Sequence, residues 1–113
     1  MMNLYAVPTE VSETAEEWLE SILTQPGVRI ERIISTGQIS PPGFYYDQSE
    51  QEWVTLLQGE ARLQFDDREV VLEAGDAVLI AAHERHRVAY TSHEPPCIWL
   101  CVFFEGGTAD AGR

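Results

Sequence analysis

Turn-forming residues divide most of this chain into short apolar segments, and this pattern constrains the fold more than any other feature of the sequence. After residue 27, glycine, proline and aspartate recur between segments of four to eight residues in which apolar and polar side chains often alternate. Ala61-Arg62-Leu63-Gln64-Phe65 alternates most clearly, so its odd-numbered positions are expected to be buried. Many short strands between turns predict an all-β sandwich or small barrel. The predicted strands are residues 28–35, 43–46, 52–57, 61–65, 69–72, 77–80, 86–91 and 97–104.

The segment before residue 28 has a different spacing of apolar residues. Thr14 and Glu17 are spaced as in a capping box, glutamates gather near the start, and Pro26-Gly27 is a typical helix end. We therefore predict one short N-terminal α-helix over residues 14–24. Its apolar face would carry Ala15, Trp18, Leu19, Ile22 and Leu23.

The 113 residues are enough for one domain, which we divide into an N-terminal helical extension (1–27), a β-barrel (28–105) and a flexible C-terminal tail (106–113). The protein is acidic, because 19 acidic residues against 7 basic ones give a formal net charge of −12 at pH 7. Nucleic acids and anionic membranes are bound through clustered cations, so this balance disfavours both as partners. We expect a small-molecule ligand or substrate instead.

The last predicted strand, residues 97–104, is apolar on both faces. It is expected to be central, or covered on its outer face by the helix or by a second subunit, and we predict a homodimer. Cys97 and Cys101 would lie about 13 Å apart along such a strand, beyond the roughly 7 Å that a disulfide allows. Two free buried thiols and an N-terminus without a secretory signal predict a cytoplasmic protein.

His86 is the first candidate functional residue. It begins a predicted strand on which Val88 and Tyr90 share its face, so all three side chains are expected to point into the barrel. A neutral imidazole in that position is a suitable ligand for Zn, Fe, Ni or Cu. The alternative is a core histidine held by hydrogen bonds.

Glu52 is the second candidate, because it begins a predicted strand that is largely apolar on both faces and it lies at the end of the row that includes Val54. A buried carboxylate costs several kcal/mol unless it is paired or bound to a metal. Asp47 or Gln48, in the polar segment upstream, could complete a site with Glu52 and His86. Glu52 could instead be a strand-end acid that lies near solvent or pairs with an arginine such as Arg87. The polar segment upstream could instead be an ordinary connecting loop.

The spacing of these residues resembles the two motifs of the cupin superfamily. Gly43 stands at the front of the first motif, and Glu52 followed after six residues by Gly59 matches its end. In the second motif, Gly75 and His86 keep the expected register, although Ala81 and His83 replace the usual proline and glycine. The resemblance covers roughly residues 28–104. It implies a cupin-like double-stranded β-helix, that is, a jelly-roll barrel.

The resemblance also implies a divalent metal, but the His-x-His pair of the first motif is absent. Its positions are occupied by Tyr46 and Gln48, or by Tyr45 and Asp47, depending on the spacing. A metal site implied by the resemblance would consist of Glu52 and His86 with an oxygen from Asp47 or Gln48. His83 is a further candidate ligand. Such a site could hold Mn, Fe, Zn or Ni, with its oxygen content favouring Mn, Mg or Fe(II). The site could equally have been lost.

Two functional hypotheses follow from the resemblance. The first is a metal-dependent isomerase or oxygenase that acts on a small polar molecule, since the sequence is similar to small single-domain bacterial cupins described as mannose-6-phosphate isomerase-like. The second is a metal-free, non-catalytic ligand-binding or regulatory cupin. Arg85 and Arg87 are the only arginines near the site, and strict alternation points both away from it, which disfavours a sugar phosphate. The expected pocket residues are Tyr46, Val54, Val88 and Tyr90, with Trp53 or Trp99 as further candidates.

Overall fold

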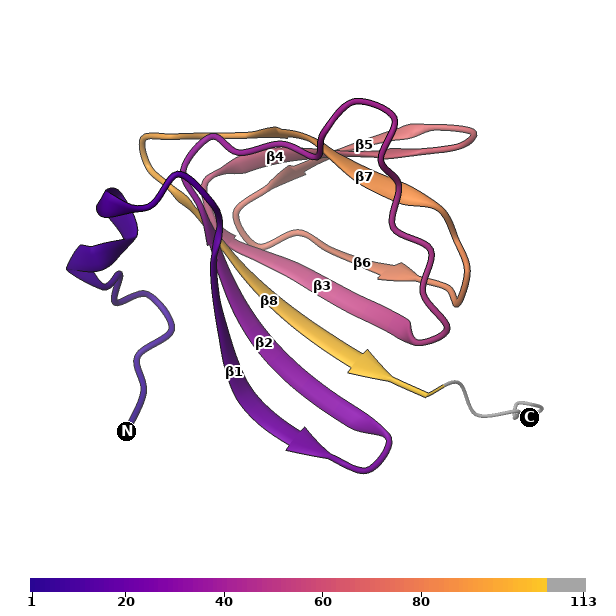
Figure 1. The fold of residues 1–113 in the computed structure, drawn as a ribbon, viewed down its shortest axis with the longest axis horizontal. Helices are drawn as coiled ribbons and strands as arrows, with labels where there is room; N and C mark the ends of the chain where they lie inside the picture. Colours follow the sequence, from indigo (N-terminus) through magenta and orange to yellow (C-terminus); the bar gives the residue numbers. More distant parts are fainter. Residues whose placement is uncertain (106–113) are drawn as a thin grey trace.

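Eight antiparallel strands in two facing sheets form the protein (Figure 1), as seen in a computed structural model that describes residues 1–105. The larger sheet has the order β1-β2-β8-β3-β6 and the smaller sheet the order β5-β4-β7. This architecture confirms the all-β, jelly-roll fold class. The strands are β1 (Trp18–Gln25), β2 (Val28–Ser35), β3 (Gln51–Gln58), β4 (Glu60–Phe65), β5 (Glu69–Glu73), β6 (Ala77–Ile80), β7 (His86–Thr91) and β8 (Cys97–Phe104).

The α-helix predicted over residues 14–24 is not formed, and strand β1 occupies most of that segment. The only helix among the described residues is a short 3-10 helix, η1 (Thr9–Glu13). Pro26-Gly27 does not end a helix but turns the chain between β1 and β2, with Gly27 at a φ of +81°, so that Gln25 pairs with Val28. The backbone hydrogen bonds to β2 outweigh the helical spacing of the side chains, and the sheet therefore begins before residue 28.

The segment at residues 43–46 is the other difference from the predicted strands. Only Tyr46 pairs with another segment, through one isolated bridge to His86. Pro41 and Pro42 lack the N–H groups that a sheet needs, and Gly43 has a φ of +79°, which breaks the extended backbone. The proposed tail, residues 106–113, lies outside the described residues.

The core lies between the sheets and is built from alternate residues of each strand. Ala61, Leu63 and Phe65 are buried, as the alternation predicts. Strand β8 is central, between β2 and β3, and Trp99 on its inner face is buried in this core. Its outer face is covered at Ile98, which packs in a second cluster of buried residues that also contains Val11 and Ile34.

The N-terminal segment lies on the outside of the larger sheet (Figure 1), and Arg32 of β2 attaches it there. The Arg32 side chain is only 4% exposed, and its guanidinium donates hydrogen bonds to the carbonyls of Asn3, Leu4 and Ala6 and forms an ion pair with Glu20. A buried guanidinium is stable only when its donors are satisfied, so these contacts hold residues 3–6 in place.

Both cysteines are free and buried, as expected for residues four apart on one strand. Cys97 contacts the Ser92 hydroxyl, and Cys101 faces the interior of the barrel. Within residues 1–105, no helix has the length and apolar character needed to cross a membrane.

Candidate functional site

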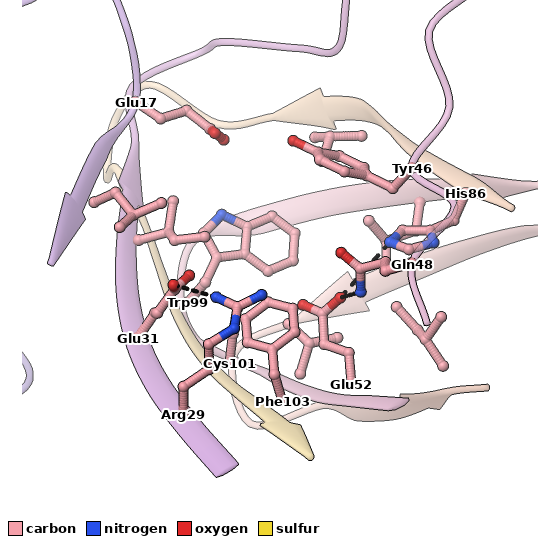
Figure 2. Close-up of a pocket in the computed structure, with 16 residues that line it drawn as sticks. Glu17, Arg29, Glu31, Tyr46, Gln48, Glu52, His86, Trp99, Cys101 and Phe103 are labelled. Atoms are coloured by element: carbon pink, nitrogen blue, oxygen red, sulfur yellow. Dashed lines mark hydrogen bonds and ion pairs between the residues drawn. The ribbon is translucent and has the colours of Figure 1, made fainter. Parts of the chain in front are cut away.

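A pocket of about 280 Å³ lies inside the barrel, between the two sheets (Figure 2). Its walls are mostly apolar and aromatic, and its polar side chains come from β2, β3, β7 and the segments before β1 and β3. A concave, largely apolar pocket with a few convergent polar groups is the usual form of a small-molecule site. The lining residues are Glu17, Leu19, Arg29, Glu31, Ile33, Tyr46, Gln48, Glu52, Val54, Leu63, Ile80, His86, Val88, Trp99, Cys101 and Phe103.

Strand register places Glu52 in this pocket. Glu52 lies opposite Phe103 of β8 on one side and Ile80 of β6 on the other, so its carboxylate stands in an apolar row. Its exposed fraction is only 7%, in the same range as that of Val54 two residues further along the strand. The carboxylate is therefore held inside the barrel by strand alternation.

His86 faces Glu52 from the opposite sheet and is 4% exposed. Its Nδ1 lies 2.9 Å from the carbonyl oxygen of Glu84, so Nδ1 carries a proton, and its Nε2 lies 3.7 Å from Glu52 Oε1. Burial lowers the pKa of His86, but the Glu52 carboxylate and the Glu84 carbonyl outweigh burial and raise that pKa above its usual value. The two side chains form a buried, charge-coupled pair that faces the pocket.

Gln48 and Tyr46 complete the polar end of the pocket. The Gln48 amide nitrogen donates a hydrogen bond of 3.2 Å to Glu52 Oε1, and the Tyr46 ring stacks on the His86 ring at 5.3 Å between centroids. The backbone bridge between Tyr46 and His86 fixes this arrangement. The structure thus brings together three of the candidate ligands, Gln48, Glu52 and His86, with the pocket residue Tyr46.

Asp47 and His83 lie elsewhere. The Asp47 carboxylate contacts His83 Nδ1 at 2.7 Å, and both side chains are more than half exposed, outside the pocket. Successive residues of an extended segment point in opposite directions, so the segment that turns Tyr46 and Gln48 inward turns Asp47 outward.

Tyr90 and Trp53 were also expected in the pocket, but the structure places both outside it, whereas Val54 and Val88 line the pocket. The β4–β7 ladder pairs Leu63 with Val88 but Arg62 with Tyr90, so Ala89 is an extra residue on β7. This bulge reverses the alternation after Val88 and leaves the Tyr90 side chain 41% exposed.

Sequence reasoning missed a charged cluster on the inner face of β2. Arg29 forms an ion pair with Glu31 and donates two hydrogen bonds to Glu50, and its guanidinium lies 3.8 Å from the centroid of the Phe103 ring. Alternating charged residues ordinarily indicate the solvent face of a strand. The available signal was that Arg29 and Glu31 share a face with Ile33 and not with Ile30.

Cys101 is a further lining residue that sequence reasoning did not place in the pocket. Burial, and after it the charge of the nearby Glu52, raises the pKa of the Cys101 thiol well above its usual value. The thiol is therefore protonated near neutral pH and is a poor nucleophile and a poor metal ligand.

The donor set fits a divalent metal poorly. Among residues 1–105, no group of three or more His, Cys, Asp and Glu side chains could hold a metal ion. The potential metal ligands that lie together in the pocket are Glu52, His86 and the Gln48 amide. The amide nitrogen points at Glu52, and the amide oxygen is a weak, neutral metal ligand. Stable protein sites for transition metals generally supply at least three strong ligands.

Comparison with known proteins identifies the family. The model of the cupin domain matches residues 32–103. A crystal structure of a putative mannose-6-phosphate isomerase from Ralstonia eutropha JMP134 is 40% identical, with a TM-score of 0.86, and covers 94% of this chain and 98% of its own.

More distant structures share the fold. A cupin superfamily protein from Desulfitobacterium hafniense DCB-2 is 18% identical, with a TM-score of 0.70, over 81% of this chain and 80% of its own. An RmlC-like cupin from Shewanella frigidimarina NCIMB 400 is 16% identical, with a TM-score of 0.67, over 80% of this chain and 78% of its own. No curated protein matches the chain significantly. The three motif glycines, the paired Glu52 and His86 and the family match agree, and the chain belongs to the cupin family.

Proposed function

We propose that this cupin binds a small polyhydroxylated molecule, of the size of a free sugar, inside the barrel. The observation that carries the proposal is the buried Glu52 and His86 pair, which faces an otherwise mostly apolar pocket. Together with Gln48, the pair offers carboxylate oxygens, an imidazole nitrogen and an amide group, which can donate to and accept from hydroxyl groups. Tyr46, Trp99 and Phe103 supply aromatic surface against which a sugar ring can pack.

The charges around the pocket favour an unphosphorylated ligand. Among residues 1–105, Arg29 is the only arginine that lines the pocket, and its guanidinium is already engaged by Glu31 and Glu50. Arg85 pairs with Asp66, and Arg87 donates to the Ser40 carbonyl, so neither is directed at the pocket. A phosphate group is bound through charge-assisted hydrogen-bond donors, and these three arginines are already engaged by other protein groups. The phosphate in the name of the Ralstonia protein is therefore not carried over to this chain.

Binding can be tested with mannose, because the indole N–H signals of the three tryptophans are separate reporters in a ¹H–¹⁵N spectrum. Trp99 lines the pocket, whereas Trp18 and Trp53 do not. We expect mannose to shift the Trp99 signal and leave the other two unchanged. Glu52→Ala should weaken binding about 10-fold to 100-fold, since it removes a buried hydrogen-bonding group.

The control for this experiment is Glu69→Ala, which removes an exposed carboxylate of β5 and should leave mannose binding unchanged. Repeating the titration in EDTA separates the two functional hypotheses: a response that disappears with the chelator supports the metal-dependent one, and a response that persists supports metal-free binding. Equal mannose responses in wild type and Glu52→Ala would refute the assignment of the site.

A second candidate function is isomerisation of a free aldose to a ketose. The specific observation in its favour is a carboxylate and an imidazole 3.7 Å apart beside the same pocket. Glu52 would take the proton from C2 of the open-chain sugar and return it to C1, while His86 would move the proton between the two oxygens. Mannose samples prepared in D₂O test this directly, because catalysis would give fructose that carries deuterium at C1. Recovery of unchanged mannose would contradict isomerisation and would support binding without catalysis.

We also propose that the protein is a homodimer, joined through the outer face of the larger sheet. The register aligns one uncharged row across all five strands, and the row spans about 20 Å at the usual strand spacing. In a chain with a net charge of −12, an uncharged apolar row is where a second copy can approach with least repulsion. The row consists of Leu79, Trp53, Val102, Ile30 and Leu23.

Light scattering at micromolar protein tests the dimer. We expect wild type at twice the 12.7 kDa chain mass and Trp53→Glu at the mass of one chain, because a carboxylate would then lie in the centre of the apolar row. Val71→Glu is the matched control, since Val71 is 60% exposed on the other sheet, and it should remain dimeric. A monomeric wild type would contradict this proposal.

A further inference from the structure

Glu17 lies where the barrel pocket meets a second cavity. This second cavity, of about 420 Å³, shares Glu17, Leu19, Tyr46 and Val88 with the first, and it extends toward the segment at residues 38–41. The two cavities are therefore adjoining parts of one groove. A ligand that is bound beside Glu52 and His86 and extends toward the second cavity therefore passes Glu17.

The Glu17 carboxylate is held in position by a short hydrogen-bonded relay. The Trp99 indole nitrogen donates to Ser35 Oγ at 3.0 Å, and the Ser35 hydroxyl donates to Glu17 Oε2 at 3.1 Å. The Ser35 side chain is fully buried, so the relay is part of the packed interior. The relay fixes the carboxylate without neutralising its charge.

Glu17 has no ion-pair partner among the described residues, unlike the other pocket acids. Glu31 is paired with Arg29, and Glu52 faces His86. Burial raises the pKa of Glu17, and the Ser35 hydrogen bond offsets this only in part. A carboxylate that is partly removed from water and lacks a cation gains from a positively charged ligand group.

The surroundings of Glu17 also suit a cation. Figure 2 shows the Glu17 and Tyr46 side chains pointing toward one another above Trp99. Aromatic faces attract cations, and Arg29 already lies over Phe103 in this same pocket. Burial raises the pKa of Tyr46, and the charges of Glu17 and Glu52 add to this effect, so both carboxylates act on this end of the groove.

We propose that Glu17 is a specificity-determining residue that binds an ammonium group, and that the ligand is an amino sugar or amino polyol. This inference rests on the proposed function, because it places the hydroxyl groups of the same ligand at Gln48, Glu52 and His86. The ammonium group donates to the Glu17 carboxylate and lies against Tyr46 and Trp99.

The test compares three ligands that differ only in the group at C1, which is a hydroxyl in mannitol, an ammonium group in 1-amino-1-deoxymannitol and a phosphate in mannitol 1-phosphate. Binding is followed by the shift of the Trp99 indole signal. We expect the amine to bind at least about 10-fold more tightly than mannitol, and the phosphate to bind most weakly. Glu17→Gln keeps the size and the hydrogen bond from Ser35 but removes the charge, so the amine should then bind no better than mannitol. Glu13→Gln, an exposed glutamate that lines neither cavity, should keep the full preference.

The outcomes separate this inference from the proposed function. If mannitol and its amine bind equally to wild type, or if the preference persists in Glu17→Gln, the ammonium assignment is overturned while polyol binding stands. If mannose and all three mannitol compounds leave the Trp99 signal unchanged, both proposals are overturned.

Discussion

Replacing Gly59 with alanine is expected to remove much of the stability of this barrel. Gly59 has a φ of +95°, and a Cβ there would lie 2.8 Å from Ser92 Oγ and 3.0 Å from both Cα and Sγ of Cys97. The left-handed backbone costs an L-residue about 1–2 kcal/mol, and overpacking adds about 1–3 kcal/mol. A total of about 2–5 kcal/mol is a large part of the net stability of a small domain, about 5–15 kcal/mol.

Gly75→Ala separates the two contributions to this effect. Gly75 has a φ of +96°, but a Cβ there would meet no atom within 4 Å, so only the backbone cost of about 1–2 kcal/mol applies. Urea unfolding of the two variants measures the difference. Equal losses of unfolding free energy would show that the close approach of Gly59 to Cys97 and Ser92 contributes nothing.

Glu52→Gln is expected to lower the pKa of His86 and to change how stability depends on pH. Burial alone lowers that pKa, and the Glu52 carboxylate contributes to the net rise above the usual 6.5. Because the folded-state pKa is raised, the stabilisation is fully present below about pH 6.5 and is lost as pH rises through the folded-state pKa. The glutamine variant should lose the most stability on the acid side, at about 1.4 kcal/mol for each unit by which the His86 pKa falls.

The imidazole proton signals of His86 measure this change directly, and urea unfolding at several pH values measures its energetic consequence. The matched control is Glu69→Gln, which changes an exposed carboxylate of β5 outside the pocket and should leave the His86 titration unchanged. An unchanged His86 titration in Glu52→Gln would mean that the 3.7 Å approach has no electrostatic consequence.

Most of the fold could be predicted from local pattern, because the strands are short and clearly separated by turns. Strands β2, β6, β7 and β8 have the predicted bounds, and β3, β4 and β5 differ by one residue at one or both ends. The failure at β1 has a specific cause: Trp18, Leu19, Ile22 and Leu23 fit a helical face, but Leu19, Ile22 and Leu23 remain exposed in the strand. Their spacing therefore carried no information about burial, and pairing with β2 decided the structure.

The candidate site was predictable to the extent that it depends on alternation and motif spacing. Glu52 and His86 were found because each sits at the end of an inward row, and Gln48 because it lies close upstream. Tyr90 was misplaced because one bulge at Ala89 reverses the alternation, and no residue type in that segment indicates a bulge. Arg29 and Glu31 were missed because charged residues on the inside of a strand need partners that only the folded chain supplies.

The sequence by itself determined the fold class, the family resemblance, the buried positions of β4 and the inward placement of Glu52 and His86. These features depend on periods and spacings along the chain, which are local. Only the tertiary structure decided that Asp47 turns away, that Arg29 is engaged by two acids, and that Glu17 is held by Ser35 without a cation. These features join residues far apart in the chain, and their energies depend on distances, burial and charge that exist only once the two sheets have come together.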